Sequence, residues 1–253
     1  MFLYHAVSSY QLIETTLHKN KYHRDEKCIL FISQDVVRRL PNYNDFCHFF
    51  SDIWVYDNGV GNYAILKGQD YAAYFQRIFH EKKVQLSDFD EIYLACAHHS
   101  FGIFVAGLQI PFVFMEDGVG ALSRPEVLHE VEKRFKNKDN LALQYGLYDG
   151  SNPQIKYCIY NAANQKEKFS HVKQLLNFEV YSELSAMTQE DRTYLLKIFT
   201  DISNIPVKKK ISADTYRAFC QFKNFFLGGA DFTVSASCRL FFGRVCGYLQ
   251  AAP

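Results

Sequence analysis

Short, nearly unbroken apolar segments alternate along this chain with longer segments of mixed polarity, and this alternation restricts the possible folds more than any other feature. A strand that is covered on both faces needs a short apolar run, whereas mixed segments whose apolar residues recur every three or four positions predict helices. The expected strands are 2–7, 28–32, 53–56, 92–96, 111–115 and 157–160, and the expected helices are 10–19, 42–50, 69–83, 102–107, 126–136 and 190–202.

Strands that alternate with helices predict βαβ units, and strands that are apolar on both faces predict a parallel sheet. We therefore expect an α/β fold, a Rossmann-like parallel sheet with flanking helices, over residues 1–205. The pattern ends soon afterwards, because residues 211–253 contain no Glu and little periodicity. We expect residues 206–253 to be a linker and an atypical or truncated C-terminal segment, which is too short to close a hydrophobic core by itself.

Charge and cysteine usage exclude several classes of protein. The formal net charge is +1, so the chain has no overall basic field of the kind that binds nucleic acid. The seven cysteines include no CxxC pair and no spacing typical of metal ligands, which favours a reducing compartment and no metal. No apolar run reaches about 18 residues, the length that spans a bilayer. We expect a cytoplasmic protein. The sequence leaves open whether it contacts the inner face of the membrane and whether it forms a homodimer.

Two adjacent carboxylates follow the expected strand 111–115. They are Glu116 and Asp117, and Gly118 and Gly120 come directly after them. Ligands of open α/β sheets bind beyond the carboxyl ends of the strands, and glycines let the backbone approach a ligand closely. Paired acids in a partly dry cleft repel each other, which raises one pKa and makes a general base. An acidic helix cap at a simple turn explains the same residues equally well.

Two further loops are expected on the same rim of the sheet. His98 and His99 follow the expected strand 92–96, and imidazoles there could bind a sugar hydroxyl, a phosphate or a carboxylate. Ser8, Ser9 and Gln11 follow the first strand, where hydroxyls and helix N–H groups suit sugars and anions. A surface histidine pair and ordinary helix capping by serine are the alternatives. Residues 57–62 predict a turn.

Three segments together resemble a known family. The opening 5–13, the acidic strand end 112–120, and the helix 188–202 with the basic residues 208–210 resemble corresponding parts of bacterial sialyltransferase-like glycosyltransferases of family 52, which are related to the polysialyltransferases. The resemblance covers residues 1–210. It implies a GT-B architecture of two Rossmann-like domains, of which this chain would hold the N-terminal, acceptor-side half while the second domain is incomplete.

The resemblance also implies an activity. An inverting, metal-independent glycosyltransferase of this kind moves sialic acid or a related sugar from a nucleotide donor, such as CMP-sialic acid, to a glycan acceptor in capsule or lipooligosaccharide biosynthesis. No cofactor beyond that donor is implied. By the resemblance Asp117 is the catalytic base that takes the proton of the acceptor hydroxyl, and Glu116 is the alternative.

One departure from the family is clear in the sequence. The family binds the leaving phosphate with a His-Pro motif in its second domain, and no His-Pro dipeptide occurs in this chain. We therefore expect that the chain, as given, lacks a complete donor site, which leaves its activity open. A non-catalytic, glycan- or protein-binding Rossmann-like module is the alternative function.

Overall fold

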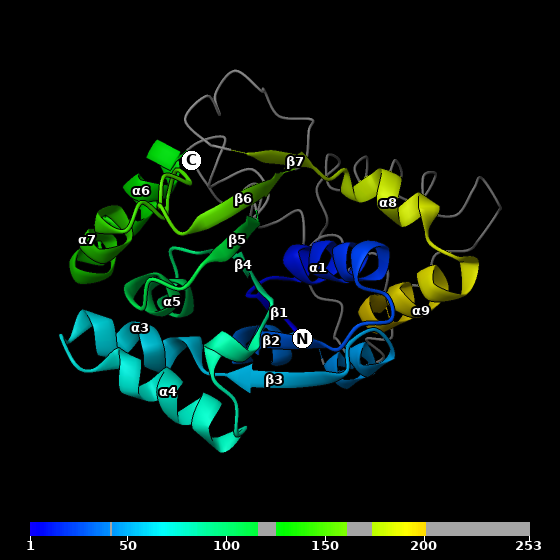
Figure 1. Cartoon of the computed structure of the whole chain (residues 1–253), viewed down its shortest axis with the longest axis horizontal. Coiled ribbons are helices and arrows are strands. Elements are labelled where there is room, and N and C mark those ends of the chain that lie inside the picture. Colours follow the sequence, from blue (N-terminus) through cyan, green and yellow to red (C-terminus); the bar gives the residue numbers. More distant parts are fainter. Residues whose placement is uncertain (41, 116–124, 161–173, 201–253) are drawn as a thin grey trace, which may run out of the picture. The chain divides into compact units, whose positions relative to one another are not determined.

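A parallel seven-stranded sheet organises the described part of the chain, which comprises residues 1–40, 42–115, 125–160 and 174–200 of a computed structural model (Figure 1). The strands lie in the order β3-β2-β1-β4-β5-β6-β7. All six strand pairs in this sheet are parallel. The sequence-based prediction of a Rossmann-like α/β fold is therefore confirmed. The strands are β1 (Phe2–Ala6), β2 (Cys28–Ser33), β3 (Asp52–Tyr56), β4 (Glu91–Ala95), β5 (Phe112–Met115), β6 (Ile155–Tyr160) and β7 (Leu175–Asn177).

The strand order reverses between β1 and β4. From β1 the chain builds outward through β2 to β3, and it then returns to the other side of β1, where β4 pairs with it from Phe2 opposite Glu91 to His5 opposite Leu94. Loops that follow two strands on either side of such a reversal diverge and leave a crevice, which is the usual ligand site of this fold. In this chain those loops begin after Ala6 and after Ala95.

Helices cover both faces of the sheet. In Figure 1, α1 lies on one face, and α3, α4 and α5 lie together on the opposite face. The helices and 3₁₀ turns are α1 (Ser9–Tyr22), α2 (Gln34–Val37), η1 (Tyr43–His48), α3 (Asn58–Leu66), α4 (Tyr71–Glu81), η2 (Leu86–Asp88), α5 (Ser100–Gly107), α6 (Pro125–Glu132), α7 (Lys136–Gln144), α8 (Val180–Ala186) and α9 (Gln189–Thr200).

Four local predictions from the sequence need correction. The predicted turn at 57–62 is the start of α3, because the carboxylate of Asp57 accepts hydrogen bonds from the N–H groups of Gly59 and Val60 and caps the helix. The predicted strand 92–96 ends at Ala95, since Cys96 has a φ of 54° that no strand residue adopts. The predicted helix 42–50 is the 3₁₀ turn η1, and the predicted helix 126–136 is divided into α6 and α7.

An aromatic core fills the face that α3, α4 and α5 cover. Phe79 and Phe101 pack against Phe31 of β2, with ring centroids 4.6 Å apart for the Phe31–Phe101 pair. Phe75 packs in turn on Phe101, with centroids 5.4 Å apart. Each of these side chains is at least 96% buried, and fully burying one Phe stabilises a fold by roughly 1.5–3 kcal/mol. This core fixes α5 and therefore the loop that leads into it.

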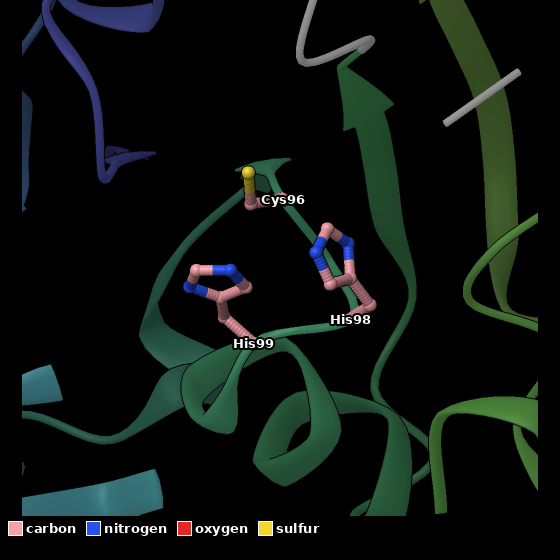
Figure 2. Close-up of side chains that lie close together, drawn as sticks. All are labelled: Cys96, His98 and His99. Carbon is pink, nitrogen blue, oxygen red and sulfur yellow. The ribbon is translucent and has the colours of Figure 1, made fainter. Parts of the chain in front are cut away.

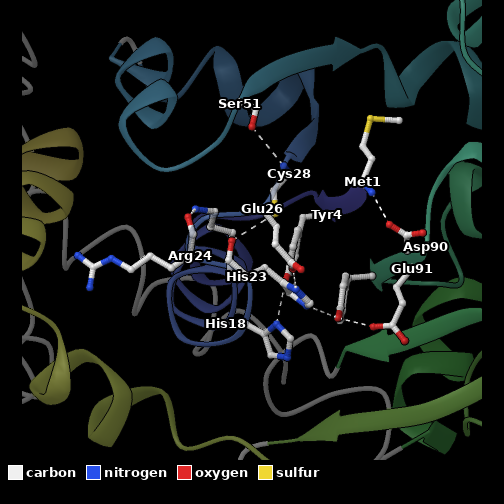
Figure 3. Close-up of polar contacts among 12 residues, drawn as sticks. Met1, Tyr4, His18, His23, Arg24, Glu26, Cys28, Ser51, Asp90 and Glu91 are labelled. Carbon is white, nitrogen blue, oxygen red and sulfur yellow. Dashed lines mark hydrogen bonds and ion pairs between the residues drawn. The ribbon is translucent and has the colours of Figure 1, made fainter.

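The opposite face carries a polar network among its aromatic rings (Figure 3). The ring of Tyr4 on β1 stacks on that of Tyr93 on β4, with centroids 4.3 Å apart, and its hydroxyl bonds to Nδ1 of His18 on α1 over 2.8 Å. The hydroxyl of Tyr93 contacts Nε2 of His23 at 2.7 Å and donates to Glu91 at 2.5 Å. The network thus ties α1 to the two strands at the reversal point.

The chain divides into two compact units. The first comprises Met1–Arg39 and Cys47–Glu183 and contains the sheet, and the second joins Leu40–Phe46 to the described residues from Leu184 to 200. Within the second unit the rings of Phe46 and Phe199 meet edge to face with centroids 5.8 Å apart. The predicted boundary at residue 205 lies outside the described residues and stays a prediction.

Among the helices of the described ranges, none is both long enough and apolar enough to cross a membrane.

Candidate functional site

A tight turn links β4 to α5 at the reversal point of the sheet. The carbonyl of Cys96 accepts a hydrogen bond of 2.9 Å from the N–H of His99, and the left-handed φ of Cys96 starts the turn. A left-handed backbone costs an L-residue of this kind about 1 kcal/mol or more, so the surrounding structure must hold it. The turn places Cys96, His98 and His99 directly beyond the carboxyl end of β4, where the strand order reverses.

The first turn of α5 packs directly on this loop. A Cβ atom added to Gly102 would lie 2.0 Å from the carbonyl oxygen of Ala97, which is far inside van der Waals contact. Glycine is therefore required at position 102, where it lets the helix approach the loop backbone. The carbonyl of His99, which is the N-cap residue of α5, accepts from the N–H of Ile103 over 2.9 Å. The loop is held by α5 rather than left to move.

Gln11 joins the loop that follows β1 to the loop that follows β4. Its Oε1 accepts from the N–H of Val7 at 2.8 Å, and its Nε2 donates to the sulfur of Cys96 at 2.9 Å. The Gln11 side chain is buried, so both contacts are shielded from water. Ser8 caps α1, since its hydroxyl accepts from the N–H of Gln11 at 3.3 Å.

A second pair of contacts ties α3 to the same loop. The side-chain amide of Asn58 lies 3.3 Å from Nδ1 of His99, and its Oδ1 accepts from the buried hydroxyl of Ser100 at 3.1 Å. Gly61, one turn further along α3, allows this approach, because a Cβ there would lie 2.5 Å from the Ser100 hydroxyl oxygen. Asn58 and Ser100 thereby orient the ring of His99.

Both imidazoles of the loop are held in the neutral form. Burial lowers the pKa of His98 to about 3, with a smaller contribution from Lys138, and burial with the neighbouring His98 lowers the pKa of His99 well below its usual value. The ring of His98 stacks on Tyr148 with centroids 5.5 Å apart. Neutral rings can bind a hydroxyl or a metal ion, but they offer no charge to an anion.

The three side chains of the turn that could ligate a metal lie close together. One ligand atom from each of Cys96, His98 and His99 lies within 4.8 Å of the other two (Figure 2). Cys96 and His98 are buried, and His99 is half-buried. Among the residues that the structure describes, no other group of three or more Cys, His, Asp or Glu side chains lies this close together.

The residues predicted from the sequence fall into three groups. Gln11 contacts the loop that carries His98 and His99, and Ser8 supports Gln11 as a helix cap. Ser9 is the first residue of α1, and its hydroxyl has no role in these contacts. The acid pair Glu116 and Asp117, with Gly118 and Gly120, lies outside the described residues, and the proposal that these residues act stays a prediction.

Two residues of the site are not predicted from the sequence. The apolar run 92–96 predicts that Cys96 lies within a strand, and the run 57–62 predicts a turn at Asn58. Ser100 belongs to the predicted group His98-His99-Ser100. Position after β4 was the available signal for Cys96, because any polar side chain directly beyond a strand of this fold is at the rim.

Searches of protein-family models, of curated proteins and of solved structures match this chain to none of them.

Proposed function

We propose that this chain is the acceptor-side half of a sialyltransferase-like glycosyltransferase that acts on surface glycans. One observation carries the proposal: β5, the second strand beyond the reversal point, ends at Met115, and Met115 pairs with Ala95 on β4 and with Ile159 on β6. Glu116 and Asp117 follow Met115 directly in the sequence. The proposal requires these carboxylates to act at the rim, beside the loop of Cys96 to His99.

The proposed reaction is a single displacement at the anomeric carbon of the donor sugar. The acceptor hydroxyl oxygen forms the new bond to this carbon, the bond from the carbon to the phosphate oxygen of CMP breaks, and CMP leaves with that electron pair. Asp117 takes the hydroxyl proton, with Glu116 as the alternative base. A positioned general base typically contributes about 10²- to 10⁴-fold to the rate.

The described rim supplies side chains suited to a sugar. Half-buried His99 is the neutral imidazole of this rim, and a neutral ring offers one donor and one acceptor without net charge. Such groups match sugar hydroxyls better than they match a phosphate. We accordingly assign this half to the acceptor. The same proposal includes metal-independent chemistry, a CMP-sialic acid donor and a location in the cytoplasm at the inner face of the membrane.

Transfer and binding assays test the proposal. Wild-type chain and the variants Asp117→Asn and Glu116→Gln are incubated with CMP-sialic acid and a fluorescent galactoside, with and without a chelator. Turnover that survives the chelator and falls about 100-fold or more in one acid variant supports the assigned base. Glu130→Gln, which removes an exposed carboxylate of α6 that pairs with Lys133, is the matched control and should leave turnover unchanged.

Acceptor binding separates the proposal from a non-catalytic module. Saturation-transfer NMR with a galactoside alone should show binding by the wild type and by Asp117→Asn. Galactoside binding without any turnover would favour the glycan-binding alternative or an incomplete donor site. A chain that binds neither galactoside nor CMP-sialic acid contradicts the proposal.

A further inference from the structure

The turn between β4 and α5 has the chemistry of a metal site that sequence spacing did not reveal. It presents one thiol and two imidazoles, with one ligand atom of each residue within 4.8 Å of the others. Sulfur and imidazole nitrogen together are the ligands that Zn²⁺ prefers, whereas Mg²⁺ and Ca²⁺ prefer oxygen. Figure 2 shows the three side chains projecting from the loop above the first turn of α5.

An unsatisfied nitrogen supports this reading independently. Nδ1 of His98 is buried and has no hydrogen-bond partner among the described residues, and the residue is 2% exposed. A buried polar atom left without a partner costs about 1–3 kcal/mol. A bond to a metal ion would satisfy it. The low pKa values of His98 and His99 fit the same role, because only the neutral ring has a lone pair to donate.

Neighbouring side chains supply the outer contacts that metal ligands usually have. Gln11 donates to the sulfur of Cys96 at 2.9 Å, which would stabilise a thiolate. The Asn58 amide faces Nδ1 of His99 at 3.3 Å. If this amide is turned by 180°, its oxygen accepts from a protonated Nδ1, its NH₂ group donates to Ser100, and Nε2 of His99 keeps the lone pair that binds a metal.

The loop is rigid enough to preorganise such a site. The hydrogen bond from His99 to Cys96 closes the turn, and Gly102 seats α5 against Ala97. Zinc bonds of about 2.0–2.3 Å place tetrahedral ligand atoms roughly 3.3–3.6 Å apart. Ligand atoms up to 4.8 Å apart therefore need to move by about 1 Å when a metal ion binds.

We propose that Cys96, His98 and His99 bind one Zn²⁺ ion and leave its fourth position to water or to another ligand. The ion would be bound by residues of a single turn and would lock that turn. This inference does not rest on the proposed glycosyl transfer, since it concerns metal binding alone.

Metal titration of the full chain without a polyhistidine tag tests the inference. Zn²⁺ affinity is measured by competition with a chromophoric chelator, and Co²⁺ is added to the metal-free chain as a spectroscopic probe. We expect one equivalent of Zn²⁺ and a thiolate-to-cobalt charge-transfer band. Cys96→Ser should remove the band and weaken Zn²⁺ binding at least about 100-fold, because loss of an outer contact alone costs about 10- to 100-fold.

Two controls keep the test decisive. Cys28→Ser replaces another buried thiol, on β2 and with a pKa that burial raises to about 11, and should keep both the affinity and the band. Zn²⁺ should also protect Cys96 of the wild type from iodoacetamide, as read by peptide mass mapping, which needs no variant to fold. A wild type without a thiolate band, unprotected Cys96, or a folded Cys96→Ser chain that binds Zn²⁺ as tightly as the wild type would each overturn the inference.

Discussion

The side-chain amide of Gln11 donates a hydrogen bond to the sulfur of Cys96 over 2.9 Å and so spans the point where the sheet reverses its strand order. The two residues are 85 positions apart in the chain, and one belongs to α1 while the other directly follows β4. Because the contact is buried, it should control both the position and the chemistry of the sulfur.

Removal of this donor should weaken the proposed metal site. Gln11→Met keeps the length and the burial of the side chain but cannot donate to Cys96, so we expect about a 10-fold or greater loss of Zn²⁺ affinity. The same variant should shift the energy of the Co²⁺–thiolate band, which a purely structural effect would not do. Gln76→Met makes the same change at an exposed position on α4, so it is the matched control and should leave the affinity unchanged. Equal affinities for Gln11→Met and the wild type would rule out a role of this contact in metal binding.

Two glycines of α5 should respond to alanine in opposite ways. At Gly102 the new Cβ would meet the Ala97 carbonyl at 2.0 Å, so Gly102→Ala should lower the free energy of unfolding by about 3 kcal/mol or more. At Gly107 the nearest atom would lie 3.4 Å away, so Gly107→Ala should be neutral or stabilise the chain by up to about 1 kcal/mol through helix propensity. Urea unfolding followed by circular dichroism measures both values, and similar effects at the two positions would show that the loop is not packed on α5 as described.

Tyr4 should stabilise the fold through its hydroxyl as well as its ring. Tyr4→Phe keeps the stacking on Tyr93 but removes the hydroxyl that bonds to Nδ1 of His18 over 2.8 Å. The other ring nitrogen of His18, Nε2, is buried and has no hydrogen-bond partner among the described residues, so the variant ring would have no partner on either nitrogen. We expect a loss of about 1–3 kcal/mol. Tyr157→Phe removes a longer contact of 3.3 Å to Glu91, which still accepts from Tyr93, and should cost less than about 1 kcal/mol. A Tyr4→Phe chain as stable as the wild type would contradict the assigned bond.

Stability should fall as the solution becomes acidic, and buried histidines should account for much of the fall. Burial lowers the pKa values of His5, His18 and His98 to about 3 in the folded chain. The unfolded chain binds protons on these rings below about pH 6.5, whereas the folded chain does not until pH nears 3. Between these limits each ring therefore lowers the free energy of unfolding by up to about 1.4 kcal/mol per pH unit, and above pH 6.5 it has no effect.

A single substitution isolates one of these rings. The Gln side chain of His18→Gln can still accept a hydrogen bond from the Tyr4 hydroxyl but cannot titrate. The slope of the unfolding free energy against pH should therefore decrease by up to about 1.4 kcal/mol per pH unit, the contribution of one proton, between roughly pH 6 and pH 5. Urea titrations across that range measure the slope. Gln76→Asn, a change at an exposed and non-titrating position on α4, is the control and should leave the slope unchanged. An unaltered slope in His18→Gln would mean that His18 is protonated in the folded chain.

The sequence predicted the strands well because a strand covered on both faces must be apolar throughout. Phe2–Ala6 and Phe112–Met115 both emerged from such runs, and their parallel arrangement followed from the helices between them. It missed α3, since Gly59 and Gly61 are poor helix formers and Asp57-Asn58-Gly59 is typical of a turn. The capping contacts of Asp57 and the need for Gly61 beside Ser100 depend on tertiary packing, which no local pattern contains.

The candidate site was predictable in position but not in composition. The rule that ligands bind beyond the carboxyl ends of parallel strands located Gln11, His98 and His99 correctly on the rim. It could not identify Cys96 as their neighbour, because the apolar run 92–96 gave no sign that the backbone becomes left-handed at its last residue. Nor could spacing predict Asn58, whose contact with His99 joins segments 41 residues apart.

The place of β4 beside β1 also affects how the chain acquires its structure. β1 can pair with β2 as soon as about the first thirty residues have emerged, but its other edge stays open until residues 91–95 arrive. Pairing over such a sequence distance is slow, and an open edge of a fully apolar strand is a template for association with other chains. Nascent or proteolysed fragments that stop short of β4 should therefore self-associate, and they should need a chaperone during synthesis until that strand closes the gap.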